Sequence, residues 1–313
     1  MELVALSIPW LLVIVIALAI VLLAIKKWKL SFSFLFFALI CNWYCETMPV
    51  NITLSDNADP EALTVMSFNC NIPPALRYDT NRRNELIKLI KEESPDIFFL
   101  TENYVFWEDS LWIAIQDQYP YRTRQYNFLG NYFYSKYPII EEIEYDGRSK
   151  HNIFCQIDYR GSVIDLFGVH FSSNNYNAEA EYLTPDSVQN RNEIKAYLKN
   201  IMNAGKRRRE EARQIVATID SLQYQGSSNP TLVMGDFNDV GGSPTLRILE
   251  SSGLKDSWWK DGVGYGATIH KPLPYRIDHI MFDDQLKLES IRKINTDKIS
   301  DHHALVAKFL FKR

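Results

Sequence analysis

The chain has 313 residues, which suits one large domain or two of ordinary size, and its 46% of apolar residues is typical of globular proteins. Its 13 glycines and 13 prolines exclude collagen-like and low-complexity sequence. The net charge is −4, and because residues 1–45 are basic on balance, the remainder is more acidic still. Such a body disfavours binding to long nucleic acids by charge alone, since that binding needs basic residues that displace phosphate counterions.

The first 45 residues contain two uncharged apolar stretches. Residues 3–25 are mostly Leu, Ile, Val and Ala, and residues 30–45 are rich in Phe and Leu and close on Trp43 and Tyr44. About 20 apolar residues cross a bilayer as a helix, and aromatic residues favour its interface. We therefore expect residues 1–45 to be a membrane anchor, formed as a transmembrane helical hairpin.

Lysines between the two stretches determine the expected orientation of this hairpin. The segment KKWK (26–29) separates the stretches, and positive charges close to a span are retained in the cytoplasm. Both chain ends would then lie outside the cytoplasm, on the periplasmic side. The alternative is one span followed by an interfacial helix over 30–45, which would leave the body in the cytoplasm. Residues 46–62 are polar and turn-rich, and we interpret them as a linker.

The body, residues 63–313, alternates strand and helix patterns, which predicts an α/β fold. Amphipathic helices are expected over 80–94, with Thr80 as a possible cap, and over 207–222. The stretch 172–206 is longer than a tight connection needs, and we expect a loop and helix there that could set specificity. Apolar or alternating segments predict strands over 62–71, 96–102, 130–139, 152–160, 162–171, 231–239, 275–283 and 304–311.

Polar residues recur at or beside the ends of these strands. Strands of one sheet can bring such residues to a single rim although they are far apart in sequence, which is how a scaffold builds a metal and acid–base site. The residues are Asn69, Glu102, His170, Asp236, Asn238, Asp278, Asp301 and His302.

Six short motifs contain these residues, namely FNCN, LTE, GVH, GDFND, RID and SDHH, in that order. In this arrangement the sequence resembles the endonuclease/exonuclease/phosphatase superfamily, also called DNase I-like, and in its layout the bacterial membrane-anchored members. The resemblance covers essentially all of 63–311. It implies a four-layer α/β/β/α sandwich of two mixed sheets as the catalytic domain, preceded by the hairpin.

The resemblance also implies roles for the residues. Glu102 and Asn69 would hold the catalytic Mg²⁺ or Mn²⁺, with Asp301 as a further ligand, and such hard cations prefer oxygen ligands. His302 would be the general base, oriented by Asp278, since imidazole titrates near neutral pH.

The remaining motif residues would serve the phosphate. By the resemblance, Asp236 and Asn238 position the attacking water and the phosphate oxygens, and His170 contacts the phosphate or serves the leaving group. Asn71 stands where abasic-site nucleases of the family carry an acidic residue, which makes a DNA-repair role less secure.

These features predict a membrane-anchored, divalent-metal-dependent phosphoester hydrolase of the phosphodiesterase or nuclease type. Its substrate would be a nucleic acid, a lipid headgroup or a small phosphoester, and no obligate protein partner is inferred. Two other classes stay open: a catalytically silent member that binds a phosphorylated ligand or partner, and a structural membrane protein.

Other residues receive structural interpretations. KRRR (206–209) is expected to be a solvated helix face, and four tryptophans are expected to pack in the core or rim: Trp107, Trp112, Trp258 and Trp259. The resemblance implies no role for four histidines, and they are expected to be structural: His151, His270, His279 and His303. The cysteines are too few for a disulfide framework, and all are expected to be free: Cys41, Cys45, Cys70 and Cys155.

Overall fold

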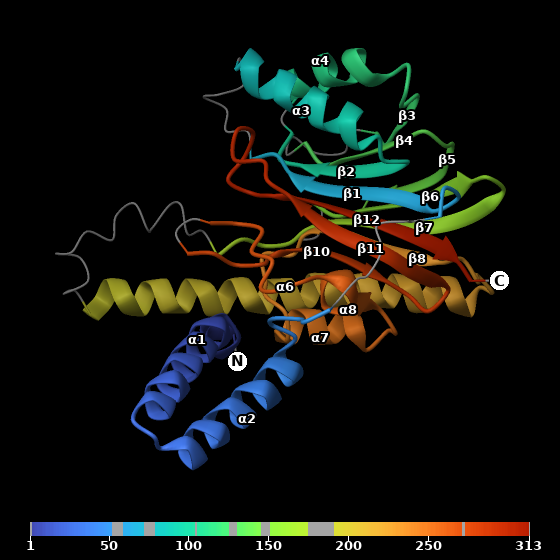
Figure 1. Cartoon of the computed structure of the whole chain (residues 1–313). Helices are drawn as coiled ribbons and strands as arrows, with labels where there is room; N and C mark the ends of the chain where they lie inside the picture. The colour runs from blue at the N-terminus through green and yellow to red at the C-terminus, as the bar shows by residue number, and fades with distance from the viewer. Residues whose placement is uncertain are drawn as a thin grey trace.

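The computed structural model confirms the α/β sandwich predicted from the sequence. Two six-stranded sheets pack face to face, with helices on both outer faces (Figure 1). Each sheet contains one parallel strand pair among antiparallel ones, so both are mixed. The structure describes residues 2–51, 59–71, 79–103, 105–124, 130–144, 151–174, 191–270 and 273–312.

The first sheet has the strand order β11-β12-β1-β2-β4-β3. β1 is antiparallel to β12 and parallel to β2. The last register pair of β1 and β2 joins Asn69 to Thr101, so the chain leaves both strands at the same edge. The strands are β1 (Leu63–Asn69), β2 (Ile97–Thr101), β3 (Tyr121–Arg122), β4 (Tyr132–Ser135), β11 (Leu286–Ile294) and β12 (Ala304–Phe311).

The second sheet has the strand order β5-β6-β7-β8-β10-β9. β7 and β8 are parallel and end together at the register pair His170–Asp236, and the antiparallel β10 begins opposite them at Asp278. Three predicted site residues therefore meet at one edge. The strands are β5 (Ile139–Glu144), β6 (Ile153–Tyr159), β7 (Ser162–His170), β8 (Thr231–Asp236), β9 (Lys255–Asp256) and β10 (Asp278–Phe282).

Three apolar clusters separate the four layers. The cluster between the sheets contains Phe99, Phe133 and Leu166, all fully buried. A second cluster joins the first sheet to α3 (Thr80–Glu93) and α4 (Val105–Ile115). The third joins the second sheet to α6 (Arg191–Tyr224) and α7 (Pro244–Glu250), and the short α8 (Ser257–Asp261) follows β9.

Two helix predictions are corrected by the structure. Asp79, rather than Thr80, caps α3, because its side chain accepts two backbone N–H groups of the first turn. The helix predicted over 207–222 is the second half of α6, a single helix of 34 residues. The helical part of the predicted 172–206 loop and helix is therefore the first half of α6, and residues 175–190 lie outside the described part of the chain.

The N-terminal residues form two antiparallel helices, α1 (Glu2–Ala24) and α2 (Trp28–Cys45). Their connection is tight, and the Ser31 hydroxyl donates to the Ala19 carbonyl at 2.7 Å. Both helices are long and apolar enough to cross a membrane, and their pairing is that of a hairpin. Figure 1 shows the hairpin projecting from the body next to α6 and α7, with its tip farthest from the sheets.

The first residues after the hairpin are attached to the body. The Arg276 guanidinium donates to the Glu46 carbonyl at 3.3 Å, and the N–H of Gly264 donates to the Pro49 carbonyl at 2.9 Å. The Asn51 amide donates to the carbonyls of Trp259 and Gly262. The start of the predicted linker therefore follows a fixed path, whereas residues 52–58 lie outside the described residues.

Candidate active site

The predicted site residues gather at one rim because the central strands of both sheets end there. Asn69 and Glu102 come from the ends of β1 and β2, and His170 and Asp236 from the ends of β7 and β8. Asp278 begins β10 opposite Asp236. The sandwich thus brings residues from both sheets to a common edge, as the strand-end pattern predicted.

The backbone is unusual at three points of this rim. Asn71, Glu102 and Asn238 have positive φ values of 36°, 55° and 50°. Asn tolerates this region, whereas Glu adopts it rarely, so the turn at Glu102 is held by its surroundings. The Asn131 side chain accepts the Glu102 N–H at 3.3 Å, which fixes the turn that brings the carboxylate to the rim.

Gly235 permits the close approach of β7 and β8. Its φ is +144°, and a Cβ at this position would lie 1.9 Å from the Val169 carbonyl oxygen. A side chain would therefore force the two strands apart next to His170 and Asp236. Steric exclusion of a side chain therefore explains why the GDFND motif has a glycine at this position.

Asn69 joins two of the predicted residues into one group, which a third, His170, extends. Its amide nitrogen lies 3.1 Å from Oε1 of Glu102 and 3.0 Å from Oδ2 of Asp236. Nε2 of His170 is 3.4 Å from the same Glu102 oxygen. The ligand atoms of Glu102, His170 and Asp236 all lie within 4.8 Å of one another, a spacing that suits a shared cation.

The second group contains the predicted base. Nδ1 of His302 lies 2.8 Å from Oδ2 of Asp278, and the His302 backbone N–H donates to the Ser300 hydroxyl at 3.0 Å. Asp236, Asp278 and His302 again place ligand atoms within 4.8 Å of one another. Asp236 belongs to both groups and connects them.

Charge interactions set the pKa values in this second group. Burial alone would lower the pKa of His302, but Asp278, its hydrogen bond, Asp236 and Asp301 raise it. Burial and the neighbouring Asp278 raise the pKa of Asp236 to about 6, although His302 and His170 act in the opposite direction. A buried group with this much negative charge has an electrostatic demand for a cation.

One orphaned atom matches that demand. Oδ1 of Asp278 is buried and has no hydrogen-bond partner within the described residues. Buried carboxylate oxygens are normally satisfied, so this atom calls for a water, a substrate group or a cation. The surrounding donors are carboxylate, amide and imidazole groups, which suits a hard divalent ion or its bound water.

Two predicted site residues, Asp301 and Asn238, make hydrogen bonds to protein groups that the predicted roles did not include. Asp301 accepts a hydrogen bond from the Asn71 amide at 2.5 Å and belongs to neither group of clustered ligand atoms. Asn238 donates its amide to the Phe171 carbonyl at 2.9 Å, and its backbone N–H donates to Asp236. Both are therefore next to the site, with part of their hydrogen-bonding capacity used by the protein.

Sequence reasoning missed several supporting residues. Asn131 holds Glu102, Ser300 holds His302 and also donates to the Asn69 carbonyl, and Asn152 accepts the His170 N–H at 3.0 Å. Ser300 stands inside the SDHH motif and Asn131 directly precedes β4, but neither position reveals its partner. Only the strand pairing does.

The expectation that KRRR is a solvated face is wrong for Arg208. This side chain is fully buried, with Nε 3.3 Å from Asp239 and a nitrogen donating to the carbonyl of Ser172. Glu211, one turn later on α6, accepts from the backbone and hydroxyl of Ser172. The helix therefore anchors the chain following both His170 and Asn238, and a buried carboxylate partner explains why a basic run contributes a core residue.

His279 is structural, as expected. It follows Asp278 in β10 but points to the opposite face, with Nδ1 2.7 Å from Asp256 and Nε2 3.0 Å from the Asp239 carbonyl. Arg276 donates to the same Asp256 carboxylate at 2.5 Å. Both ring nitrogens are occupied by protein, so the ring takes no part in the rim.

His303 and His270 form another contact beside the site, with Asp297 nearby. Nδ1 of His303 accepts the Thr296 N–H at 3.2 Å, so in the neutral ring the proton resides on Nε2. An Nε2 that carries a proton does not bind a metal ion, which favours the structural interpretation made for His303. The four cysteines are free, as expected.

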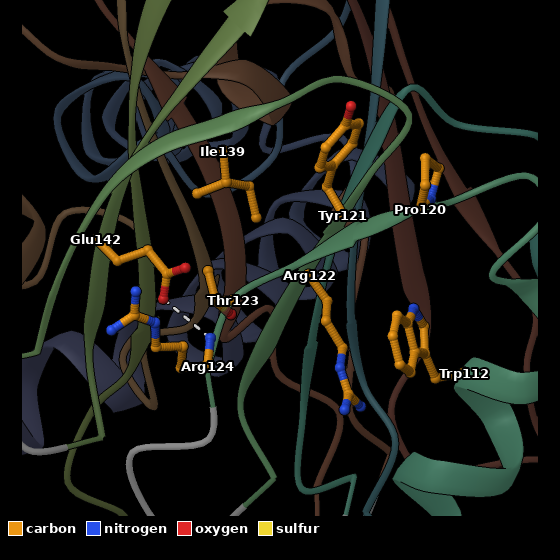
Figure 2. A pocket seen from close by; sticks show the side chains of 8 residues that line it. All are labelled: Trp112, Pro120, Tyr121, Arg122, Thr123, Arg124, Ile139 and Glu142. Atoms are coloured by element: carbon orange, nitrogen blue, oxygen red, sulfur yellow. Dashed lines mark hydrogen bonds between the residues drawn. The ribbon is translucent and has the colours of Figure 1, made fainter.

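A separate pocket of about 470 Å³ lies at the open edge between β3 and β5 (Figure 2). Trp112, Arg122 and Glu142 are among its lining residues, and the Arg122 guanidinium lies 4.0 Å from the centre of the Trp112 ring. Figure 2 shows Arg122 next to Trp112 and Arg124 beside Glu142. No predicted site residue lines this pocket, so the rim remains the candidate site.

Comparison with protein families identifies the chain. The model of the endonuclease/exonuclease/phosphatase family matches residues 66–302, which include every predicted site residue. The chain belongs to this family. A comparison with curated protein sequences gives no match. Family members are phosphoester hydrolases that use divalent metals, and the resemblance inferred from the six motifs is confirmed at the level of the family.

Solved structures share the fold at low sequence identity. A mannosyl-6-phosphatase of Bacteroides thetaiotaomicron is 17% identical, with a TM-score of 0.60, over 80% of this chain and 100% of that one. D. rerio TDP2 complexed with a single-strand DNA product is 14% identical with a TM-score of 0.57, over 80% and 100%. Beta toxin of Staphylococcus aureus is 16% identical with a TM-score of 0.53, again over 80% and 100%. At these identities the likeness concerns the fold.

Proposed function

We propose that the protein is a membrane-anchored phosphoester hydrolase that needs Mg²⁺ or Mn²⁺ and uses His302 to activate water. The observation that carries this proposal is the buried Asp278–His302 pair beside the Glu102–Asp236 group, with one Asp278 oxygen left without a partner among the described residues. A silent binding protein would not need a polarised histidine next to a cluster of buried carboxylates.

The resemblance implied Glu102 and Asn69 as the metal ligands, but the Asn69 amide nitrogen donates to Glu102 and Asp236 and its oxygen accepts the Asn71 N–H. We therefore propose Glu102 and Asp236 as the main ligands, with Asn69 between them and Asp301 as an outer ligand. When bound, a divalent ion neutralises charge on the phosphoryl oxygens and lowers the pKa of coordinated water. Asn69 fixes the distance between the two carboxylates through its amide hydrogen bonds. Oxygen donors of this kind favour Mg²⁺ or Mn²⁺ over softer metals.

His302 would take the proton of the attacking water. Asp278 engages Nδ1 at 2.8 Å, which leaves Nε2 as the nitrogen that faces the reaction. The carboxylate fixes the tautomer and the ring orientation, and it stabilises the imidazolium that forms. His170, 3.4 Å from Glu102, would contact a phosphate oxygen or the leaving group, and Asn238 would help to orient the phosphate.

The substrate would be a phosphoester of the kind that family members process: a nucleic acid, a lipid headgroup or a small molecule. The structural relatives include a phosphatase for a phosphorylated sugar and a protein with a single-strand DNA product. The acidic body and the apolar hairpin favour a lipid or small phosphoester over long DNA.

A hydrolysis assay on the full-length protein in detergent tests this proposal. DNA, RNA, sphingomyelin, inositol phosphates and p-nitrophenyl phosphoesters would be compared side by side. Activity on at least one substrate should vanish after chelation and return with Mg²⁺ or Mn²⁺. Glu102→Ala should remove most activity, whereas Glu92→Ala, an exposed carboxylate on α3, should not. Full activity after exhaustive chelation would contradict the proposal.

We also propose that the body faces away from the cytoplasm. The antiparallel helices place both ends of the hairpin at the body and Lys26 and Lys27 at the far tip, which suits retention of the tip in the cytoplasm. A reporter that works only outside the cytoplasm should be active when fused after Arg313 and inactive when fused after Leu30. A cytoplasmic signal from the full-length fusion would reverse this orientation.

A further inference from the structure

The first turns of α1 are part of the body. Leu6 and Ala5 are buried in an apolar cluster with Ile201 of α6 and Tyr275. The Trp10 indole donates to the Tyr275 hydroxyl at 3.1 Å, and that hydroxyl donates to the Leu6 carbonyl at 3.2 Å. The segment that would enter the membrane is thus fixed directly against the catalytic domain.

This attachment shortens the part of the hairpin that can cross a bilayer. If the helix up to Trp10 lies beside the body, Leu11–Ala24 remain, and at about 1.5 Å per residue they span about 21 Å. The hydrocarbon core is about 30 Å thick. For Lys26 and Lys27 to reach the far side, the near surface of the bilayer must therefore extend up to the level at which α1 meets α6.

The first half of α6 has the surface that this position requires. Met202 and Ile194 on α6 are 58% and 37% exposed although they are apolar, and Leu273, which lies beside α6, is 46% exposed. Between α1 and α6 runs an apolar groove of about 340 Å³, lined by Leu3, Leu6, Trp10, Tyr197, Leu198 and Ile201 together with Leu273 and Tyr275. In Figure 1 this half of α6 extends past the edge of the sheets, above the hairpin.

The charge of α6 divides in the same way. Its first part, residues 191–209, contains seven basic residues, one of them the buried Arg208, and one acidic residue, whereas 210–224 contain one basic and three acidic. Lys195 and Lys199 are exposed and one turn apart, next to the groove residue Leu198. Basic residues at a membrane surface are attracted to anionic headgroups, although the body as a whole is acidic.

We propose that the first half of α6 and the start of α1 form a lipid-binding face, with an acyl chain of an anionic phospholipid in the groove and its headgroup at Lys195 and Lys199. The inference rests on the proposed membrane anchoring. The body would then be seated on the bilayer instead of tethered above it. Tyr275 pairs with Ile269, and Ile269 pairs with His302, so this face lies close to the candidate site.

Site-specific labels in lipid nanodiscs test the seating. A bimane fluorophore would be placed on the full-length chain at Met202→Cys, with Cys41, the half-buried cysteine of α2, replaced by Ser. Tyr224→Cys, 94% exposed at the other end of α6, serves as the matched control, and Ile14→Cys reports insertion of the hairpin. Brominated lipid should quench the label at 202 at least half as strongly as at 14, and leave the label at 224 unchanged.

A label at 202 that behaves like the one at 224 would overturn the lipid-binding face while the quenching at 14 left the anchor intact. No quenching at 14 would instead overturn the anchor, and the inference with it. The lipid composition tests whether Lys195 and Lys199 bind an anionic headgroup. Including phosphatidylglycerol should increase the quenching at 202 severalfold over phosphatidylcholine alone. Lys195→Glu with Lys199→Glu should abolish this dependence, and Lys88→Glu on α3 should preserve it; equal quenching in both lipids would contradict the headgroup assignment.

Discussion

The rim of the sandwich and the opposite face of β10 each contain a buried Asp–His pair, and the two pairs differ in the charged group next to them. At the rim, Asp278 and His302 are 2.8 Å apart and adjoin the carboxylate of Asp236. On the opposite face of β10, Asp256 and His279 are 2.7 Å apart and adjoin the guanidinium of Arg276. The neighbouring group therefore adds negative charge to the pair at the rim, whereas it adds positive charge to the pair of Asp256 and His279.

This difference determines what each histidine can do. Nε2 of His279 donates to the Asp239 carbonyl, so this ring has no nitrogen left for substrate. His302 uses Nδ1 for Asp278 and keeps Nε2 for the reaction. An Asp–His contact alone therefore does not define a catalytic pair; the groups around it do.

The largest expected effect is on hydrolysis, from His302→Ala. Loss of a positioned general base lowers kcat about a hundredfold to ten-thousandfold. The fold should persist, because the ring lies at the rim, and circular dichroism would verify this. Steady-state kinetics on the substrate found in the hydrolysis assay measure the change. A variant with nearly full kcat would assign the base to another group.

Asp256→Asn should affect stability instead of chemistry. Removing one charge of a buried pair costs about 3–5 kcal/mol, because Arg276 loses its partner. Burial raises the pKa of Asp256, but Arg276 and His279 lower it more, so the pKa lies well below its ordinary value. This contribution to stability is therefore present above the unfolded-state pKa of about 3.9 and is lost as the pH falls through the native value.

Urea unfolding of the wild-type protein and of Asp256→Asn in detergent, followed by circular dichroism, measures the difference in their free energies of unfolding. The gap in unfolding free energy should be full at pH 6 and should narrow progressively below about pH 4. The folded Asp256→Asn protein should retain the wild-type kcat at pH 7 to within a few-fold. A gap that is independent of pH would show that the charge of Asp256 is not what stabilises this face of β10.

Asp278→Asn should lower kcat nearly as much as the loss of the base itself, by about a hundredfold or more, because the ring of His302 remains but loses its tautomer and orientation. Since the two residues act as a unit, the double variant with His302→Ala should be about as slow as His302→Ala alone. Multiplied losses in the double variant would mean that the two side chains act independently.

Ser300→Ala should have the smallest effect. Its hydroxyl accepts the His302 N–H and donates to the Asn69 carbonyl, so it connects the base to the metal side of the rim. One such hydrogen bond contributes about 1 kcal/mol, which corresponds to about a fivefold change in kcat/KM. An effect as large as that of Asp278→Asn would show that the connection between the two groups matters more than the geometry indicates.

The sequence predicted the rim because strand-end polar residues are a local pattern. Each site residue lies at an end of an apolar strand or in the loop beside one, as Asp236 does at the end of the segment from Thr231, so no tertiary information is needed. The parallel pairing of β1 with β2 and of β7 with β8 then brings these ends together. The family resemblance supplied the relation between the two sheets, which local patterns do not contain.

The sequence did not predict the partners that lie across the fold. Arg208 reads as one cation in a basic run, and its burial depends on Asp239, 31 positions later. His279 and Asp278 are neighbours in sequence, and only their opposite faces on β10 separate the structural ring from the rim carboxylate. Asn131 holds Glu102 through pairing of β2 with β4.

A Mn²⁺ titration of the chelated full-length protein tests the central claim most directly, with bound metal followed by electron paramagnetic resonance and hydrolysis followed in the same samples. In the wild-type protein, binding and activity should rise together with one midpoint. Glu102→Ala should lose both, while Glu92→Ala should retain both. If Glu102→Ala binds Mn²⁺ as the wild type does, or if hydrolysis proceeds before any metal binds, the rim is not a metal-dependent hydrolytic site and the account is wrong.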